Sequence, residues 1–132
     1  MKLRYAILYV RDPAASLAFY EAAFDLKRRM LHPDGDYGEL ETGSTRLGFS
    51  ALGLMAQLGK DVAPADPHRP SFELAFETED VGEALKRALD AGAVLVQEAQ
   101  DMPWGQTTSY VRDPDGFLVE ICSPVAKTDA AQ

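Results

Sequence analysis

The sequence predicts an α+β fold made of two βαβββ modules, each of which forms an open half-barrel sheet. Three observations support this prediction. A strand–aspartate–helix pattern that begins at Tyr5 occurs again 68 positions later, so that Asp12 matches Asp80. Each of the two helical segments is followed by three segments with the composition of β-strands. The stretches between these segments are rich in turn-forming residues.

The first module begins with a strand at residues 5–10, where aromatic and β-branched side chains predominate. Asp12 is suited to cap a helix whose first position is Pro13. Apolar residues then recur at helical spacing to about residue 24. Three further strands are expected near residues 26–32, 37–42 and 45–50.

The second module repeats this order. A strand is expected at residues 72–76, and a helix follows the acidic pair Glu79 and Asp80 and ends at Gly92. An Asp-Pro-Asp-Gly turn joins the last two strands of this module. The three strands after the helix are expected near residues 94–99, 107–112 and 117–122.

Length and charge limit the classes of function. We expect one domain, because 132 residues suit a single domain or two halves that share a core. Its expected parts are module one (about 3–55), a linker (about 56–70), module two (about 71–124) and a tail (125–132). A net charge of −8 argues against nucleic-acid binding. No apolar run approaches the roughly 18 residues of a membrane span, and no signal segment is evident, so we expect a cytoplasmic protein without a membrane partner.

One helix can cover only one face of a four-stranded sheet, so the other face must contact a second sheet, a partner chain or a ligand. Because side chains alternate along a strand, Glu73 and Glu120 are expected to project from that uncovered face. They are either exposed sheet carboxylates or a pair that binds a cation, ligates a metal or acts as acid and base.

The repeat, the strand–aspartate–helix opening and the segment RDPDGFLVE at residues 112–120 resemble the glyoxalase I, bleomycin resistance and extradiol dioxygenase superfamily, also called the vicinal oxygen chelate superfamily. The similarity covers roughly residues 3–124. It implies a small-molecule pocket on the open sheets, and it implies a homodimer.

The resemblance also implies four metal-ligand positions, which in metal-dependent members typically carry His or Glu at the first and third and Glu at the second and fourth. These positions hold Tyr5, Gly48, Glu73 and Glu120 in this sequence. Glycine has no ligating side chain, and neutral tyrosine is a poor ligand. Catalytic zinc usually has about three protein ligands. We therefore expect no cofactor and no metal; a divalent metal, if bound, would use Glu73 and Glu120.

Aromatic residues provide further candidates for the pocket. Trp104 lies between Pro and Gly in a loop, so it either covers apolar surface at the rim or stacks on a ligand, as the resemblance implies. Tyr5, Tyr9 and Tyr110 are candidates for the pocket wall. Phe49 is expected to face the first helix instead.

Arg46 shares its strand face with Gly48. It either reaches the cavity and holds an anionic group or lies at a sheet edge.

Three hypotheses of function remain. The first is a metal-independent protein of the bleomycin-resistance kind, which sequesters a cationic or aromatic compound, such as an antibiotic, in an acidic, aromatic-lined groove. The second is a lyase, isomerase or dioxygenase of the glyoxalase class, similar to lactoylglutathione lyase, in which Glu73 and Glu120 are the candidate catalytic residues. The third is a scaffold with a vestigial pocket.

Overall fold

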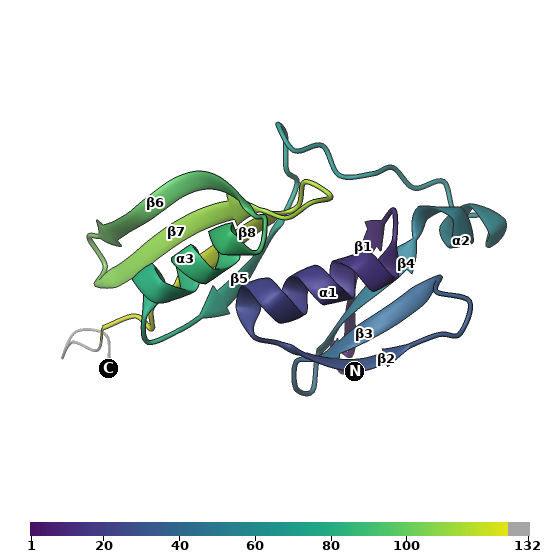
Figure 1. Ribbon diagram of the computed structural model, residues 1–132, viewed down its shortest axis with the longest axis horizontal. Helices are drawn as coiled ribbons and strands as arrows, with labels where there is room; N and C mark the ends of the chain where they lie inside the picture. The colour runs from purple at the N-terminus through teal and green to yellow at the C-terminus, as the bar shows by residue number, and fades with distance from the viewer. Residues whose placement is uncertain (127–132) are drawn as a thin grey trace. The chain divides into compact units, whose positions relative to one another are not determined.

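A computed structural model describes residues 1–126 of the chain (Figure 1). The chain divides into two units, Met1–Asp66 (unit 1) and Pro67–Gln132 (unit 2). No helix within residues 1–126 is long and apolar enough to cross a membrane.

Unit 1 contains one four-stranded sheet with the strand order β1-β4-β3-β2. Strand β1 is parallel to β4, and the other neighbours are antiparallel. A short helix, α2, follows the last strand. The elements are β1 (Tyr5–Val10), α1 (Pro13–Phe24), β2 (Lys27–Leu31), β3 (Tyr37–Glu41), β4 (Arg46–Ala51) and α2 (Leu52–Gln57).

Unit 2 has the same topology, with the order β5-β8-β7-β6 and a parallel pair formed by β5 and β8. The predicted α+β fold of two βαβββ modules is therefore confirmed. Strand β6 runs to Met102, beyond its predicted end, because Met102 pairs with Gln106 across a tight turn. The elements are β5 (Glu73–Glu77), α3 (Val81–Asp90), β6 (Val94–Met102), β7 (Gln106–Arg112) and β8 (Leu118–Cys122).

Aspartates begin both long helices, as the sequence predicts. The Asp12 carboxylate accepts hydrogen bonds from the first backbone amides of α1, at 3.1 and 3.4 Å. The Asp80 carboxylate accepts one from the amide of Glu83 at 3.1 Å. These bonds satisfy amides that have no partner within the helix. Position 80 is thus equivalent to position 12 in structure as well as in sequence.

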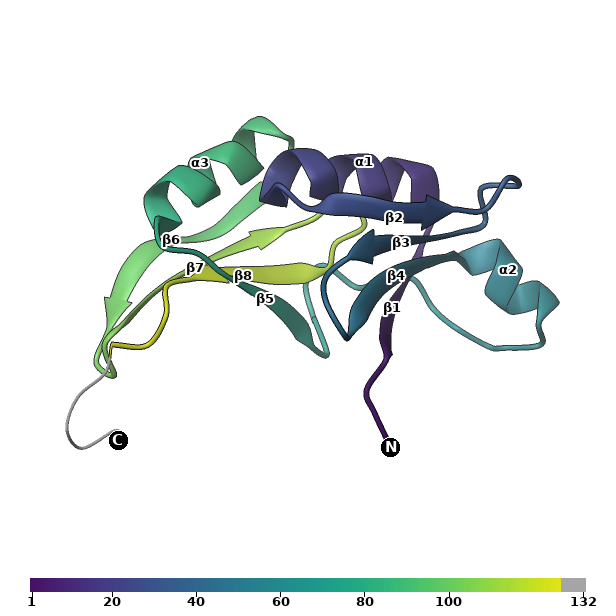
Figure 2. The same ribbon diagram turned by 90° about the horizontal axis from the view of Figure 1, so that it is seen from below.

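Each helix covers one face of its own sheet (Figure 2). In unit 1 the face under α1 is closed by Leu8, Val10 and Phe49, and the Phe49 ring lies 5.1 Å from that of Tyr20 on α1. Phe49 therefore belongs to the core and not to a pocket wall, as its position in the strand predicts. In unit 2 the corresponding buried residues are Val81, Leu85, Ala88, Val111, Val119 and Ile121.

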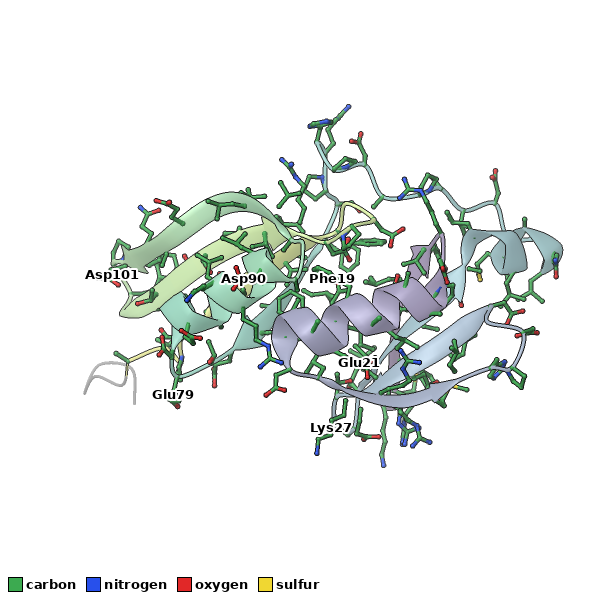
Figure 3. The ribbon with its side chains drawn as sticks, in the orientation of Figure 1. Phe19, Glu21, Lys27, Glu79, Asp90 and Asp101 are labelled. Carbon is green, nitrogen blue, oxygen red and sulfur yellow. The ribbon has the colours of Figure 1, made fainter. Side chains whose placement is uncertain are left out.

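The helix side of each unit also carries charged side chains that are exposed to solvent. Glu21 of α1 forms a salt bridge of 2.8 Å with Arg28 of β2, and Figure 3 shows Glu21 on the helix with Lys27 at the start of that strand. In the same view, Glu79 lies just before α3, and Asp90 is the last residue of this helix. The residues on the opposite faces of the sheets are the ones that define the candidate site.

Candidate functional site

Glu73 and Glu120 lie on neighbouring strands of unit 2, on the sheet face opposite α3. Glu120 pairs in register with Ala75 of β5 and with Tyr110 of β7, whereas Val119 and Ile121 on either side of it are buried under the helix. Glu73 is exposed and Glu120 is half-buried. The uncovered face therefore carries both carboxylates.

Tyr110 brings these two acids together. Its hydroxyl group donates a hydrogen bond of 3.4 Å to Oε2 of Glu73, which is long for an O–H···O bond. The pKa of Tyr110 is raised to about 12, chiefly because burial disfavours the phenolate and then because the charges of Glu120 and Glu73 repel it. Tyr110 is thus a neutral donor between two carboxylates, and its bond to Glu73 is a weak one.

No basic side chain compensates for this pair. Within residues 1–126, neither Glu73 nor Glu120 has a salt bridge to Lys, Arg or His. The surrounding charge has the same sign, since unit 2 carries −7 of the net charge of −8 (12 acidic against 5 basic residues). Unit 1 carries only −1 (9 against 8). The uncovered face of unit 2 is therefore suited to a cation.

Two residues continue this face toward the end of β8. Thr108 and Cys122 form a register pair, and both are buried. The Oγ1 atom of Thr108 has no hydrogen-bond partner among the described residues. Burial, and then the Glu120 charge, raises the pKa of the Cys122 thiol. The thiol is therefore protonated near neutral pH and is a poor nucleophile.

Trp104 lies at the turn between β6 and β7, and 54% of its surface is exposed. Its indole Nε1 donates a hydrogen bond of 2.7 Å to Oε1 of Gln106, whose Nε2 donates one of 3.0 Å to the backbone oxygen of Ser123. These bonds hold the ring at the sheet margin. Because Gln106 and Tyr110 are four residues apart on one strand, about 13 Å separates the ring's anchor from the acidic pair.

In unit 1, the ring of Tyr37 occupies the space beside Gly48. A Cβ atom at position 48 would lie 2.7 Å from the Tyr37 hydroxyl oxygen, so only glycine permits this approach. The hydroxyl group donates a hydrogen bond of 2.7 Å to Oε2 of Glu39. Burial and this bond raise the pKa of Tyr37. Oε1 of Glu39 also accepts a 3.2 Å bond from Nε of Arg29.

Sequence reasoning missed Tyr37 and Glu39. Their spacing along β3 could have indicated them, because Tyr37 and Glu39 are two residues apart and Glu39 is a charged residue between Gly38 and Leu40. A carboxylate at the centre of a half-buried strand requires hydrogen-bond partners.

The other predicted residues of unit 1 lie on β1 and β4. Tyr5 pairs in register with Arg46, and Tyr9 pairs with Ser50. Tyr5 is 48% exposed, whereas Tyr9 and Arg46 are half-buried. The predicted site residues are thus divided between the two units. Tyr5, Tyr9, Arg46 and Gly48 lie on the uncovered face of unit 1, and Glu73, Trp104, Tyr110 and Glu120 belong to unit 2.

A second group of possible ligands, which the sequence analysis did not single out, occupies the turn between β2 and β3. Donor atoms of His32, Asp34 and Asp36 all lie within 4.8 Å of one another. The pKa of Asp34 is lowered and that of Asp36 is raised, mainly by the hydrogen bond between the two side chains. His32 and Asp34 are exposed to solvent. These contacts are those of a polar turn.

The residues at the four metal-ligand positions of the resembled superfamily do not form a metal site of that kind. Gly48 offers no ligand atom, and Tyr37 covers the position. Tyr5 offers only a phenol. The two carboxylates of Glu73 and Glu120 fall short of the three protein ligands that catalytic zinc usually has.

Two βαβββ units, each with a helix on one sheet face and polar residues on the other, define the glyoxalase-like class of folds. The family model described as "Glyoxalase/Bleomycin resistance protein/Dioxygenase superfamily" matches residues 2–121, and the chain belongs to this superfamily.

Two sequence relatives and one solved structure illustrate the similarity to known proteins. An uncharacterised protein of Mycobacterium bovis is 30% identical over 127 residues, which are 92% of this chain and 83% of the relative. A probable lactoylglutathione lyase of Synechocystis is 27% identical over 98% of this chain and its own full length (100%). The crystal structure of a glyoxalase-related enzyme from Fulvimarina pelagi has a TM-score of 0.80 and 25% identity, covering 94% of this chain and 88% of that one.

Proposed function

We propose that the protein is a metal-independent small-molecule-binding protein of the bleomycin-resistance kind, which sequesters a cationic, aromatic compound on the uncovered face of unit 2. The observation that carries this proposal is the cluster of Glu73, Tyr110 and Glu120, in which two carboxylates flank one neutral hydroxyl group. Glu73 and Glu120 would hold the positive charge, and Tyr110 would support them.

The charge distribution supports a cationic ligand. A partly buried carboxylate without a basic partner loses hydration and gains no opposite charge from the protein in return. A ligand cation placed between Glu73 and Glu120 would supply the missing partner. The surrounding charge of unit 2 would also raise the rate of encounter with such a ligand.

The position of Trp104 supports a ligand larger than one ring. Its indole is exposed and fixed by Gln106, and about 13 Å of strand β7 separates this anchor from Tyr110. A compound that contacts both must therefore extend along the strand and carry an aromatic or apolar group at the Trp104 end. Aromatic faces bind flat ligands and cations.

We further propose that the protein acts as a homodimer in the cytoplasm. Strand β6 is an edge strand on which Val94, Leu95 and Val96 are 53%, 40% and 44% exposed. An exposed apolar sheet edge of this kind is a template for pairing with another chain. Sedimentation velocity of the purified chain would test this, and a monomer at all concentrations would contradict it.

The binding proposal is tested by following Trp104 fluorescence during titration with bleomycin, a cationic glycopeptide. Saturable binding is expected. The double variant Glu73→Gln with Glu120→Gln should weaken it by about 1–3 kcal/mol, the range for hydrogen bonds to charged groups. The matched control changes two carboxylates at the ends of α3, Glu79→Gln with Asp90→Asn, and should leave binding unchanged. Equal binding by all three proteins would contradict the role of the acidic pair.

The metal-independent part of the proposal has its own test. Elemental analysis of protein purified without a polyhistidine tag should find less than about 0.1 metal ion per chain, since a site with about three protein ligands is not expected. Near-stoichiometric zinc, nickel or iron would contradict it and would favour the glyoxalase-class enzyme, with Glu73 and Glu120 among the ligands.

A further inference from the structure

Arg46 is a cation on the uncovered face of unit 1. Within residues 1–126 it has no salt bridge to an acidic side chain. Its Nε atom is shielded from solvent and has no hydrogen-bond partner, whereas the residue as a whole is only half-buried. The Nε end of the stem is therefore held by packing, while part of the residue remains in contact with solvent.

Glu39, an acid of β3 on the same sheet face, already has two hydrogen-bond partners. Oε2 of Glu39 accepts the Tyr37 hydroxyl at 2.7 Å, and its Oε1 accepts Nε of Arg29 at 3.2 Å. Arg29 also reaches Glu41, with 3.7 Å between Nη1 and Oε2. Arg29 thus contacts both acids of β3. Among residues 1–126, neither of these acids forms a salt bridge with Arg46.

The neighbours of Arg46 on strand β1 are aromatic and apolar. Its register partner on β1 is Tyr5, which is 48% exposed, and the next residue on the same face of β1 is Ile7, which is 42% exposed. Such neighbours reduce the screening of the guanidinium charge by water. They also offer a flat surface to a ring attached to an anionic group.

We propose that Arg46 is an anion subsite, which binds the oxyanion of an aromatic or apolar compound, a carboxylate or a phosphate, against Tyr5. The planar guanidinium group presents two parallel N–H donors, which match both kinds of oxyanion. This subsite differs in charge from the acidic face of unit 2 and does not depend on it. Unit 1 can thus bind a compound that carries an anionic group.

The test is a titration of the ¹⁵N-labelled full chain with benzoate and, separately, with phenyl phosphate, followed by NMR. Saturable shifts are expected for the Arg46 Nε–H signal and for the backbone amides of Arg46 and its neighbours. Arg46→Gln should raise the dissociation constant roughly ten- to a hundredfold, the loss expected for a charge-assisted hydrogen-bond pair. The two titrations distinguish a carboxylate from a phosphate site.

Arg28→Gln is the matched control, because Arg28 belongs to the same sheet but forms its salt bridge with Glu21 on the helix side. It should leave anion binding unchanged. An Arg46→Lys variant keeps the charge but loses the two-donor geometry, and it should bind more weakly than the wild type. The proposal is overturned if no signal shifts saturably, if Arg46→Gln binds as the wild type does, or if Arg28→Gln removes binding equally. Bleomycin binding by unit 2 is measured separately and has no bearing on these outcomes.

Discussion

Replacement of Gly48 by alanine tests how the uncovered face of unit 1 is built. The new Cβ atom would lie 2.7 Å from the Tyr37 hydroxyl oxygen, so the ring must shift. The buried Glu39 carboxylate then loses its 2.7 Å hydrogen bond, at a cost of about 1–3 kcal/mol. Alanine is otherwise favoured over glycine in a strand by about 0.5–1 kcal/mol. We expect a net destabilisation of about 0.5–2 kcal/mol.

The assay is urea denaturation of the wild type, Gly48→Ala, Tyr37→Phe and the double variant. Without the Tyr37 hydroxyl group, the nearest atom to the new methyl group is Cζ at 3.3 Å, which requires only a small adjustment. Gly48→Ala should therefore be neutral or stabilising in the Tyr37→Phe background, with a coupling free energy of about 1–2 kcal/mol. Additive effects, within about 0.5 kcal/mol, would refute this reasoning.

Three further predictions concern unit 2. Tyr110, with a pKa of about 12, should be about one-tenth ionised at about pH 11, where an ordinary tyrosine is about nine-tenths ionised. Because this pKa exceeds that of tyrosine in the unfolded chain, the contribution of Tyr110 to stability should be lost between about pH 10 and 12. The phenolate absorbance that Tyr110→Phe removes should appear near pH 12. Its appearance near pH 10 would contradict the burial of Tyr110 and its carboxylate contacts. Cys122 should react with a disulfide reagent far more slowly in the native than in the unfolded protein, because its thiol is buried and its pKa is raised; equal rates would show an open thiol. Trp104→Ala should weaken bleomycin binding, measured by calorimetry, by about 1–3 kcal/mol, and Trp104→Phe should weaken it less; unchanged affinity would make the indole a rim residue without a binding role.

Local chemistry made the fold predictable from the sequence. Asp12 and Asp80 cap equivalent helices through the hydrogen bonds that their positions imply. The period-two alternation of β4 and β8 assigns Phe49 and Ile121 to the cores under the helices. Alternation also places Glu73 and Glu120 on the same face, because parity along a strand depends only on position.

The contacts on the uncovered faces depend on register between strands, which the sequence does not specify. The sequence alone shows that Gly48 offers no side chain to a metal. The approach of the Tyr37 ring to Gly48, however, follows only from the pairing of β3 with β4. The meeting of Tyr110 with both acids likewise depends on the pairing of β8 with β7 on one side and with β5 on the other.

The most direct test of the acidic pair is calorimetric titration with benzamidine, an aromatic cation, and with benzamide, its neutral counterpart, near neutral pH and at low salt. The wild type should bind benzamidine saturably and benzamide far more weakly, because only the cation can pair with Glu73 and Glu120. The variant Glu73→Gln with Glu120→Gln should lose this preference, and the control Glu79→Gln with Asp90→Asn should keep it. Equal affinity for the two compounds in the wild type, or a preference that persists without both carboxylates, would contradict the account.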